Sequence, residues 1–493
     1  MKLLSSQQIH QWDAFTILHE PIESIGLMER AAQRCVDWIS DNNFFDHKIK
    51  IFCGKGNNGG DGLAIARLLI NKNYDVAVYI LEFGARGTED FQINLHLLHQ
   101  TTTEIHFIQS TEFIPVIDKN DIVIDALYGS GLNRPLQLLS KEIVEHINQS
   151  TTNIISVDVP SGMSIDKSSK GNTIIRAKHT LTFQSLKLCF LTAENEDYFG
   201  EVHVLDIGLN QQFIESTETV FEIIAQQQIV SKIKPRKDFS HKGNYGHALL
   251  VAGSKGKMGA ALLAAKACLR TGSGLVTINI PEQFQSAVNS FLPEAMTMDR
   301  DDENSFNNFS TIAIGPGIGI DNYGQQIVLK VLDAYKKPMV VDADALNIIS
   351  GNKNILKLVP HGSILTPHPK EFERLFGVCE NEFERLEKAI ELSNQNPFII
   401  ILKGHYTLIA ANGRGYFNTT GNAGLAKGGS GDVLTGMIAS LLAQNYEPLQ
   451  AAMIAVYLHG LAADLALENQ STESLLATDV IDAIGKAFNF LKD

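Results

Sequence analysis

Short apolar runs recur along the first two hundred residues, and segments with helical spacing separate them. The runs occupy residues 48–54, 76–81, 122–127, 153–159, 179–183 and 202–208. Continuous runs rich in β-branched residues are typical of strands buried on both faces, and intervening helices favour parallel pairing. The pattern therefore predicts an α/β domain over residues 1–215, built on a doubly wound parallel sheet.

The pattern changes near residue 210, where the chain becomes polar, then basic, then rich in glycine. A second alternating series follows at residues 247–253, 275–280, 311–319, 338–346, 362–368 and 398–410. The length of 493 residues also exceeds what one core usually holds, about 250–300 residues. We therefore expect a second parallel α/β domain over residues 225–493.

Composition narrows the classes of partner and compartment. Hydrophobic residues make up 44% of the chain, which excludes a disordered protein, and 41 basic against 55 acidic residues give a net charge of −14. This balance disfavours non-specific binding to nucleic acid or to anionic membranes, so we expect neither partner. No uninterrupted apolar run reaches the ~18 residues of a membrane span, and the first residues lack a secretory core. The five cysteines are scattered and without a C-x-x-C pair, which favours a reducing, cytoplasmic location.

A glycine-rich loop, CGKGNNGGDG at residues 53–62, joins the first predicted strand to a helix. Successive amides at a helix N-terminus form an anion site, so the loop suits a phosphate or pyrophosphate. A tight turn is the simpler alternative, but it would not need the polar side chains of Asn57, Asn58 and Asp61. The spacing also differs from the dinucleotide-binding pattern G-x-G-x-x-G.

Polar residues stand at the ends of three predicted strands of this domain. Asn58 lies in the glycine-rich loop, Asp125 ends a strand before ALYGSGLNRP, and Asp158 and Ser161 belong to DVPSG. The carboxyl ends of parallel strands face one crevice, where ligands bind. Each aspartate alone could cap a loop, but together these oxygens suit a hard cation. Asp158 is our candidate acid/base, because a carboxylate beside a substrate can move a proton.

The segments GNNGGDGLAIAR, DALYGSGL, SVDVPSG and HVLDIG resemble the NAD(P)H-hydrate epimerase family over almost all of residues 1–215. The resemblance implies a Rossmann-like fold, a bound potassium ion and epimerisation at the hydrated carbon of the dihydropyridine ring. Potassium would be held by Asn58, Asp125 and Ser161. The substrate would be bound by Asp158 and by Asn57, Asn58, Gly59, Gly60, Asp61, Gly129, Ser130, Gly131, Leu132, Asn133, Arg134 and Pro135.

The clearest motif of the second domain is KGGSGDVLTG at residues 427–436, which opens an apolar helix. Its glycines free backbone amides for an anion at the helix N-terminus. Asp432 in the first turn could deprotonate a hydroxyl beside a phosphate chain, or could serve only as a favourable charge on the helix dipole. The Walker pattern G-x-x-x-x-G-K-[ST] is absent from the sequence.

Other predicted strand ends supply partners for this helix. They carry GPGIG at 315–319, DADAL at 342–346, and TPHPKEF with His368 between two prolines. Prolines hold His368 in a rigid local frame, which suits ligand contact, although a lone histidine is often structural. Lys403 ends a further strand and suits a nucleotide phosphate.

This set, with KGNYGHALLVAGS and LKGHYT, resembles the ribokinase-like superfamily and, within it, the ADP-dependent NAD(P)H-hydrate dehydratases, over residues 225–493. The resemblance implies a ribokinase-like α/β fold, Mg²⁺, ADP as co-substrate, and Asp432 as the base that activates the substrate hydroxyl. The hydrated cofactor would contact Ala260, Gly317, Gly319, His368 and Asp432. The nucleotide would contact Lys403, Gly404, His405, Tyr406, Thr407 and Gly431. Lys427 stands where family members often have threonine, which leaves the choice between ADP and ATP open.

Together the two resemblances imply one pathway, in which an epimerase interconverts R and S hydrated NADH or NADPH and a dehydratase restores the S form. The alternative is a ribokinase-like kinase of a small molecule or vitamin precursor, fused to a nucleotide-binding module, because fold alone does not fix function. Such a kinase would release a stable phosphate ester. A purely structural protein would leave the glycine-rich anion loops unexplained. We also expect a homo-oligomer.

Overall fold

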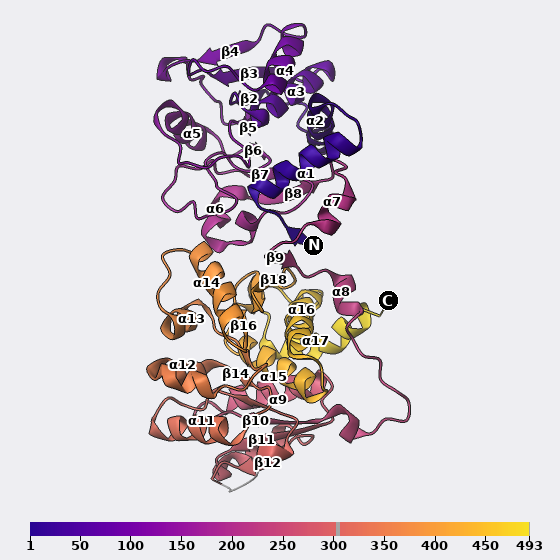
Figure 1. Cartoon of the computed structure of the whole chain (residues 1–493), viewed down its shortest axis with the longest axis vertical. Helices are drawn as coiled ribbons and strands as arrows, with labels where there is room; N and C mark the ends of the chain where they lie inside the picture. The colour runs from indigo at the N-terminus through magenta and orange to yellow at the C-terminus, as the bar shows by residue number, and fades with distance from the viewer. Residues whose placement is uncertain (302–305, 493) are drawn as a thin grey trace. The chain divides into compact units, whose positions relative to one another are not determined.

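The computed structural model describes residues 1–301 and 306–492 and contains two compact units. Lys2–Thr219 forms most of one unit, and Val220–Glu380 with Glu384–Asp493 forms most of the other. Each unit is an α/β domain built on its own sheet (Figure 1). The expected α/β class is therefore confirmed for both halves of the chain.

The first unit holds a seven-stranded, fully parallel sheet in the order β4-β3-β2-β5-β6-β7-β8. The strand order reverses between β2 and β5, which are neighbours, so the loops after these strands flank the crevice at the switch point. The strands are β2 (Ile49–Cys53), β3 (Val76–Leu81), β4 (Ile105–Ile108), β5 (Ile122–Ala126), β6 (Ile154–Val157), β7 (His179–Phe183) and β8 (Glu201–Leu205). A short strand, β1 (Lys2–Leu3), precedes them.

Helices cover both faces of this sheet because side chains alternate between its faces. Ile51 of β2 packs in the core beneath α2, α3 and α4, whereas its neighbour Phe52 packs in the core beneath α5. The helices are α1 (Ser6–His19), α2 (Ser24–Asp41), α3 (Asn57–Asn71), α4 (Glu89–His99), α5 (Leu138–Ser150), α6 (Glu196–Phe199) and α7 (Gln211–Ser216). The sequence pattern did not predict β4, an edge strand whose His106 and Phe107 are exposed.

The sheet of the second unit runs in the order β9-β18-β17-β16-β15-β14-β13-β10-β11-β12. Here the order reverses between β10 and β13, which again places two loops at a switch point. The strands are β9 (Phe221–Ile223), β10 (His247–Val251), β11 (Leu275–Ile280), β12 (Met296–Asp299), β13 (Thr311–Ile314), β14 (Val340–Val341), β15 (Ile364–Leu365), β16 (Ile399–Leu402), β17 (Thr407–Ala411) and β18 (Arg414–Asn418). The helices are α8 (Gln226–Val230), α9 (Met258–Arg270), α10 (Gln285–Phe291), α11 (Asn322–Ala334), α12 (Ala343–Gly351), α13 (Pro369–Phe376), α14 (Glu382–Gln395), α15 (Ser430–Ala443), α16 (Pro448–Ala466) and α17 (Ala477–Phe490).

Part of the second sheet is antiparallel, so the expectation of purely parallel pairing was wrong there. The run at 398–410 is not one strand, because β16 and β17 form an antiparallel hairpin that turns through residues 403–406. Strand β18 continues the antiparallel pairing. The apolar run alone hid the turn, although Gly404 marks it.

Helix α16 is long and apolar enough to cross a membrane, with a mean hydropathy of 1.4. However, 78% of its apolar window is buried within the protein, where residues of α16, α15 and α17 share one hydrophobic core. Burial of this kind is typical of the core helix of a globular domain. The five cysteines are all free and buried.

Candidate active sites

A cavity of about 700 Å³ opens in the first unit at the switch point of the sheet. Its walls come from the loops after β2 and β5, from the start of α3, and from α1 and the segment after β7. Ten residues expected to bind substrate line it: Asn57, Asn58, Asp61, Gly129, Ser130, Gly131, Leu132, Asn133, Arg134 and Asp158. The volume is in the usual range for a site that holds a small organic ligand.

Glycines at the start of α3 pack against backbone and so shape the cavity from behind. A Cβ on Gly59 would overlap the carbonyl oxygen of Gly54, and a Cβ on Gly54 would overlap that of Leu127. Gly59 and Gly60 are buried in the helix and, like Pro135, are not among the lining residues. The two glycines in the helix therefore allow close packing, while Asn57, Asn58 and Asp61 face the cavity.

Asp158 lies at the end of β6 and forms a buried ion pair with Lys187. Oδ1 of Asp158 accepts a hydrogen bond from Lys187 Nζ at 2.7 Å, and Oδ2 accepts one from the backbone amide of Ser130 at 3.2 Å. Burial alone would raise the pKa of Asp158, but the ammonium of Lys187 outweighs it and holds the pKa below its ordinary value. Asp158 is therefore an ionised carboxylate that faces the cavity from a left-handed backbone conformation, with φ of +66°.

Two further carboxyl groups line the same cavity. Burial, reinforced by the negative charge of Asp158, raises the pKa of Asp13 to about 7. Burial also raises the pKa of Asp61, and the charges of Asp158 and Asp13 add to the effect. The cavity thus joins an ionised carboxylate to a carboxyl group that exchanges its proton near neutral pH, which is the pairing that acid–base chemistry needs.

Helix α1 supplies Asp13, which the sequence analysis missed. Ser5 and Gln8 cap the start of α1 reciprocally, and the Ser6 hydroxyl donates to the carbonyl of Ser130 at 2.8 Å. These bonds hold α1 against the loop after β5, so that His10 and Asp13 line the cavity. The i, i+3 spacing of His10 and Asp13 in IHQWDAF was the available signal.

Lys187 was missed as well. It lies in a short segment after β7, its ammonium also donates to Thr182 Oγ1 at 2.5 Å, and 1% of its side chain is exposed. A lysine in QSLKL resembles an ordinary surface residue in sequence. Only the fold brings it beside Asp158, 29 residues earlier in the chain.

Asp125 and Ser161 are fully buried and are not among the residues that line the cavity. Asp125 accepts hydrogen bonds from the Ser161 amide at 2.9 Å, from Ser161 Oγ at 2.5 Å and from Ser156 Oγ at 2.8 Å. Its hydrogen-bond partners include no Lys or Arg among the described residues, and burial raises its pKa. The Asn58 side chain is also buried. A Cβ added at Gly129 would touch its amide group, and its Nδ2 has no hydrogen-bond partner among the described residues. A buried carboxylate whose hydrogen-bond partners include no cationic side chain fits a hard cation in charge and donor type. The unpaired atom of Asn58 is an N–H donor, which does not ligate a cation.

In the second unit the loops after β10 and β13 meet at the switch point. The Gly253 amide donates to the carbonyl of Pro316 at 2.7 Å, and a Cβ on Gly317 would lie 3.3 Å from that of Ala260. Gly317 has φ of +64°, a conformation that glycine adopts without strain. The amide of Gly319 donates to Asp344 at 2.9 Å. Ala260 and Gly317 are thus neighbours, and Gly319 lies two residues further along the same loop.

Asp432 lies in the first turn of α15, close to a buried charged network. Burial and the negative charge of Asp342 raise the pKa of Asp432 to about 6. Lys403 Nζ lies 3.0 Å from Asp342 Oδ1, and Thr435 Oγ1 donates to Asp342 Oδ2 at 2.8 Å. A Cβ on Gly431 would lie 3.6 Å from Lys403 Nζ, so the start of α15 and the end of β16 meet here. A carboxyl group that ionises near pH 6 in this position is suited to act as a general base.

His368 caps α13 and is half-exposed. Its Nδ1 accepts hydrogen bonds from the backbone amides of Lys370 and Glu371 at 3.1 and 3.2 Å, and these bonds fix the ring. The other ring nitrogen, Nε2, lies 3.5 Å from Oε1 of Glu371. The loop with Gly404, His405, Tyr406 and Thr407 is the β16–β17 turn, joined to the site through Lys403. Lys427 donates instead to the carbonyl of Glu473, so its ammonium is engaged away from the anion loop in this structure.

Two family models match the chain, one over each unit. The model described as "NAD(P)H-hydrate dehydratase" matches residues 248–486, and the model described as "YjeF-related protein N-terminus" matches residues 24–189. Each match spans the motifs that lie at the two switch points. The match over 248–486 agrees with the resemblance drawn from the sequence and speaks against the vitamin-kinase alternative.

Curated relatives match nearly the whole chain. The bifunctional NAD(P)H-hydrate repair enzyme of Moorella thermoacetica is 33% identical over 98% of this chain and 96% of its own length. The Escherichia coli enzyme of the same name is 34% identical over 89% of this chain and 84% of its own. A solved ribokinase-like superfamily protein from Enterococcus faecalis, 27% identical, covers 56% of this chain and 98% of its own, with a TM-score of 0.51. The chain therefore belongs to the family of bifunctional NAD(P)H-hydrate repair enzymes.

Proposed function

We propose that the cavity of the first unit performs the epimerase step and that the site around Asp432 performs the dehydratase step. Membership of the family gives the chain an isomerase activity and a lyase activity that together repair hydrated NADH and NADPH. The observation that supports the division most strongly is the presence of a separate acid–base site in each unit. The first lies at the switch point of its sheet, and the second lies at the start of α15, beside the end of β16. We accordingly assign the epimerase to residues 1–215 and the dehydratase to residues 225–493.

In the epimerase site, inversion at the hydrated carbon requires one bond to that carbon to break and re-form, and a proton is transferred in each of these two steps. We assign Asp158 as the base, because Lys187 keeps its carboxylate ionised at neutral pH. Asp13, with a pKa of about 7, is suited to return the proton. The start of α3 and the loop of residues 129–134 would bind the dinucleotide through backbone amides and polar side chains.

In the dehydratase site, Asp432 would take the proton from the substrate hydroxyl as that oxygen is phosphorylated. Loss of the phosphate and of a ring proton then restores the dihydropyridine. Lys403 and the amides at the start of α15 would hold the nucleotide phosphates, since both present positive charge at one point. Ala260, Gly317, Gly319 and His368 would contact the hydrated cofactor.

We assign potassium to Asn58, Asp125 and Ser161; Asn58 lines the cavity, and the other two residues are buried behind its lining. When bound it would supply a positive charge beneath the substrate. The chain's own contribution is three hydrogen bonds to Asp125, from the hydroxyls of Ser156 and Ser161 and from the Ser161 amide, which oppose the rise in its pKa that burial causes. Exchange of potassium for a larger organic cation should therefore lower epimerisation and leave dehydration of the S form unchanged.

Magnesium and ADP belong to the proposal for the second unit. Asp342, Asp344 and Asp432 gather carboxylate oxygens, which Mg²⁺ accepts together with nucleotide phosphates. ADP as co-substrate, the homo-oligomer and the cytoplasmic location stay predictions.

The test follows the absorbance at 340 nm while a mixture of R and S hydrated NADH is incubated with protein, K⁺, Mg²⁺ and ADP. We expect full recovery of NADH from wild type, recovery of the S fraction only from Asp158→Asn, and no recovery from Asp432→Asn. Addition of the Asp158→Asn protein to the Asp432→Asn protein should restore full recovery, because each supplies the step that the other lacks. Full recovery by Asp158→Asn alone, faster than spontaneous epimerisation, would remove Asp158 from its role.

A further inference from the structure

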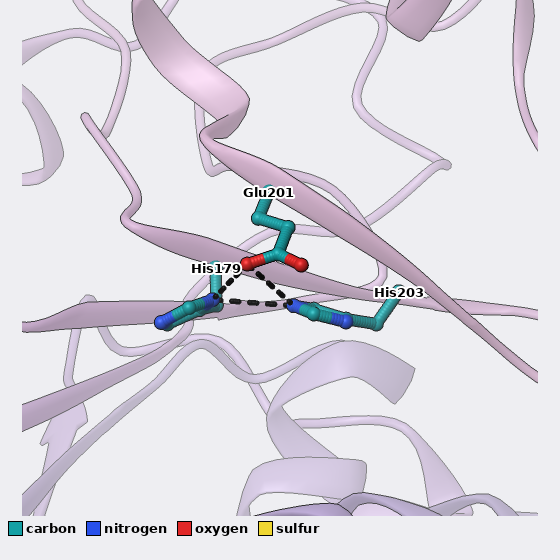
Figure 2. A group of neighbouring side chains, drawn as sticks. All are labelled: His179, Glu201 and His203. Carbon is teal, nitrogen blue, oxygen red and sulfur yellow. Dashed lines mark hydrogen bonds and ion pairs between the residues drawn. The ribbon is translucent and has the colours of Figure 1, made fainter. Parts of the chain in front are cut away.

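A second cluster of potential ligands lies in the first unit, at the opposite end of the sheet strands from the cavity. His179 begins β7, and Glu201 and His203 lie on its neighbour β8, the edge strand (Figure 2). Residues 201 and 203 point to the same face because they are two apart. His179 stands directly opposite Glu201 in the register of the two strands.

The three ligand atoms are close enough to surround one ion. Nδ1 of His179 lies 3.2 Å from Nε2 of His203 and 3.6 Å from Oε2 of Glu201. Nε2 of His203 and Oε2 of Glu201 are 3.9 Å apart. A tetrahedral ion with ligands at about 2.0–2.1 Å separates its ligand atoms by about 3.3–3.4 Å. The observed triangle needs changes of only a few tenths of an ångström to reach that geometry.

The two imidazoles are held in place by Trp38 of α2. The Trp38 ring lies 5.1 Å from the ring of His179 and 4.7 Å from that of His203, measured between centroids. Both histidines are largely covered, whereas 70% of the Glu201 side chain is exposed. The nitrogen ligands are therefore preorganised, and the carboxylate can close over an ion that enters from solvent.

A simpler account is a His–His hydrogen bond beside a solvent-exposed glutamate. That account explains the 3.2 Å distance, but it does not require the carboxylate to approach both ring nitrogens at once. Two histidines and one carboxylate from adjacent strands form a known ligand type for zinc, with one position left for water. The cavity begins at Phe183, at the other end of β7, about 13 Å along the strand from His179.

We propose that His179, Glu201 and His203 bind one Zn²⁺ ion at the edge of the first unit's sheet, separate from the cavity and from the potassium ligands. The two strands each contribute to the ion, so it would clip the edge strand β8 to β7. This site is independent of the proposed catalytic roles.

The test is a titration of the full chain, first stripped with a chelator and kept in potassium and magnesium. Zn²⁺ binding is measured by calorimetry, and Co²⁺ binding by its visible absorption, which reports nitrogen and oxygen ligands. We expect one ion per chain in wild type, and at least a tenfold loss of affinity in His203→Gln. Glu201→Gln should weaken binding as well, and because Glu201 is exposed this variant keeps its fold.

The chain offers a matched control on the other edge of the same sheet. His106 and Glu104 of the β4 region form a similar pair, with 3.4 Å between Nε2 and Oε2, but no second histidine is paired with them among the described contacts. His106→Gln should bind Zn²⁺ as wild type does. Equal binding by wild type, Glu201→Gln and His203→Gln would overturn the proposal, as would an equal loss in His106→Gln. Because NADH recovery is measured separately, failure of the zinc site leaves the epimerase and dehydratase assignments intact.

Discussion

Lys187 Nζ lies 2.7 Å from Oδ1 of Asp158, and 1% of the lysine side chain is exposed to solvent. The lysine reaches this position across two neighbouring strands, since Asp158 follows β6 and Lys187 follows β7. The pair fixes the charge of the carboxylate before any substrate enters. Its removal should therefore change both the stability of the first unit and the pH dependence of epimerisation.

Lys187→Met should destabilise the first unit by about 3–5 kcal/mol, because it leaves a buried carboxylate without its partner. The lowered pKa of Asp158 contributes stability above pH 4 that is lost as the pH falls through the folded-state value. In Lys187→Met this contribution to the free energy of unfolding disappears. The difference in stability between wild type and the variant is therefore largest at neutral pH and becomes smaller in acid. This difference in stability is measured by the urea dependence of thiol labelling at Cys35 and Cys53, which are fully buried in the folded protein. Lys119→Met, at an exposed position, is the control, and an equal loss there would contradict the prediction.

Asp13→Asn should remove an apparent pKa near 7 from the pH profile of epimerisation and lower its rate by about 10²–10⁴-fold. The stability effect has the opposite sign to that of Asp158. The raised pKa of Asp13 favours the folded state below pH 4, and this stabilisation is lost as the pH rises through 7. The variant should thus be less sensitive to pH between 5 and 8 in thermal unfolding. Asp46→Asn, on an exposed loop, should keep the wild-type profile, and an unchanged profile in Asp13→Asn would exclude Asp13 from the reaction.

Asp432→Asn should lower ADP-dependent dehydration of the S form by about 10²–10⁴-fold, with epimerisation unchanged. In wild type the rate should fall below pH 6, because Asp432 acts as a base only when ionised and its pKa is about 6. Single-turnover recovery of NADH from the S form measures both effects. Asp333→Asn, exposed on α11, provides the comparison. Retained dehydration in Asp432→Asn would leave that carboxylate as a helix-dipole charge only.

Replacement of either of two glycines of the first unit by alanine should change the stability of the protein, but in opposite directions. Gly59→Ala places a Cβ against the carbonyl of Gly54 and should cost about 1–3 kcal/mol and disturb the cavity wall. Gly26→Ala lies in α2 with nothing within 4 Å and should stabilise by about 0.5–1 kcal/mol, because glycine is a poor helix former. Thermal unfolding of both variants checks the contrast. A neutral Gly59→Ala would show that the start of α3 can move.

Much of the fold was readable because buried parallel strands leave continuous apolar runs, as at Val76–Leu81 and Leu275–Ile280. The β4 strand could not be predicted in this way, because half of its residues are exposed. The β16–β17 hairpin was hidden inside one apolar run, because local hydrophobicity carries no information about strand direction.

The same contrast holds for the sites. Motif residues such as Asp125, Asp158 and Asp432 stand at strand or helix ends, where spacing alone indicates a crevice. Asp13 and Lys187 do not, because their importance arises from tertiary contact with distant segments. The family matches support the assignment of each site to its reaction, and the roles of individual residues await the experiments above.

The wall that α1 adds to the cavity also has a consequence during synthesis. Asp13 is made early, but Lys187, which lines the same cavity, follows 174 residues later, so at ribosomal speeds of 5–20 residues per second roughly 9–35 s pass between them. Throughout that interval Trp12, which is 4% exposed in the finished protein, has no Asn210 carbonyl to receive its indole hydrogen bond. Helix α1 is therefore synthesised well before the last strands of its own sheet, and its apolar side stays uncovered until they follow.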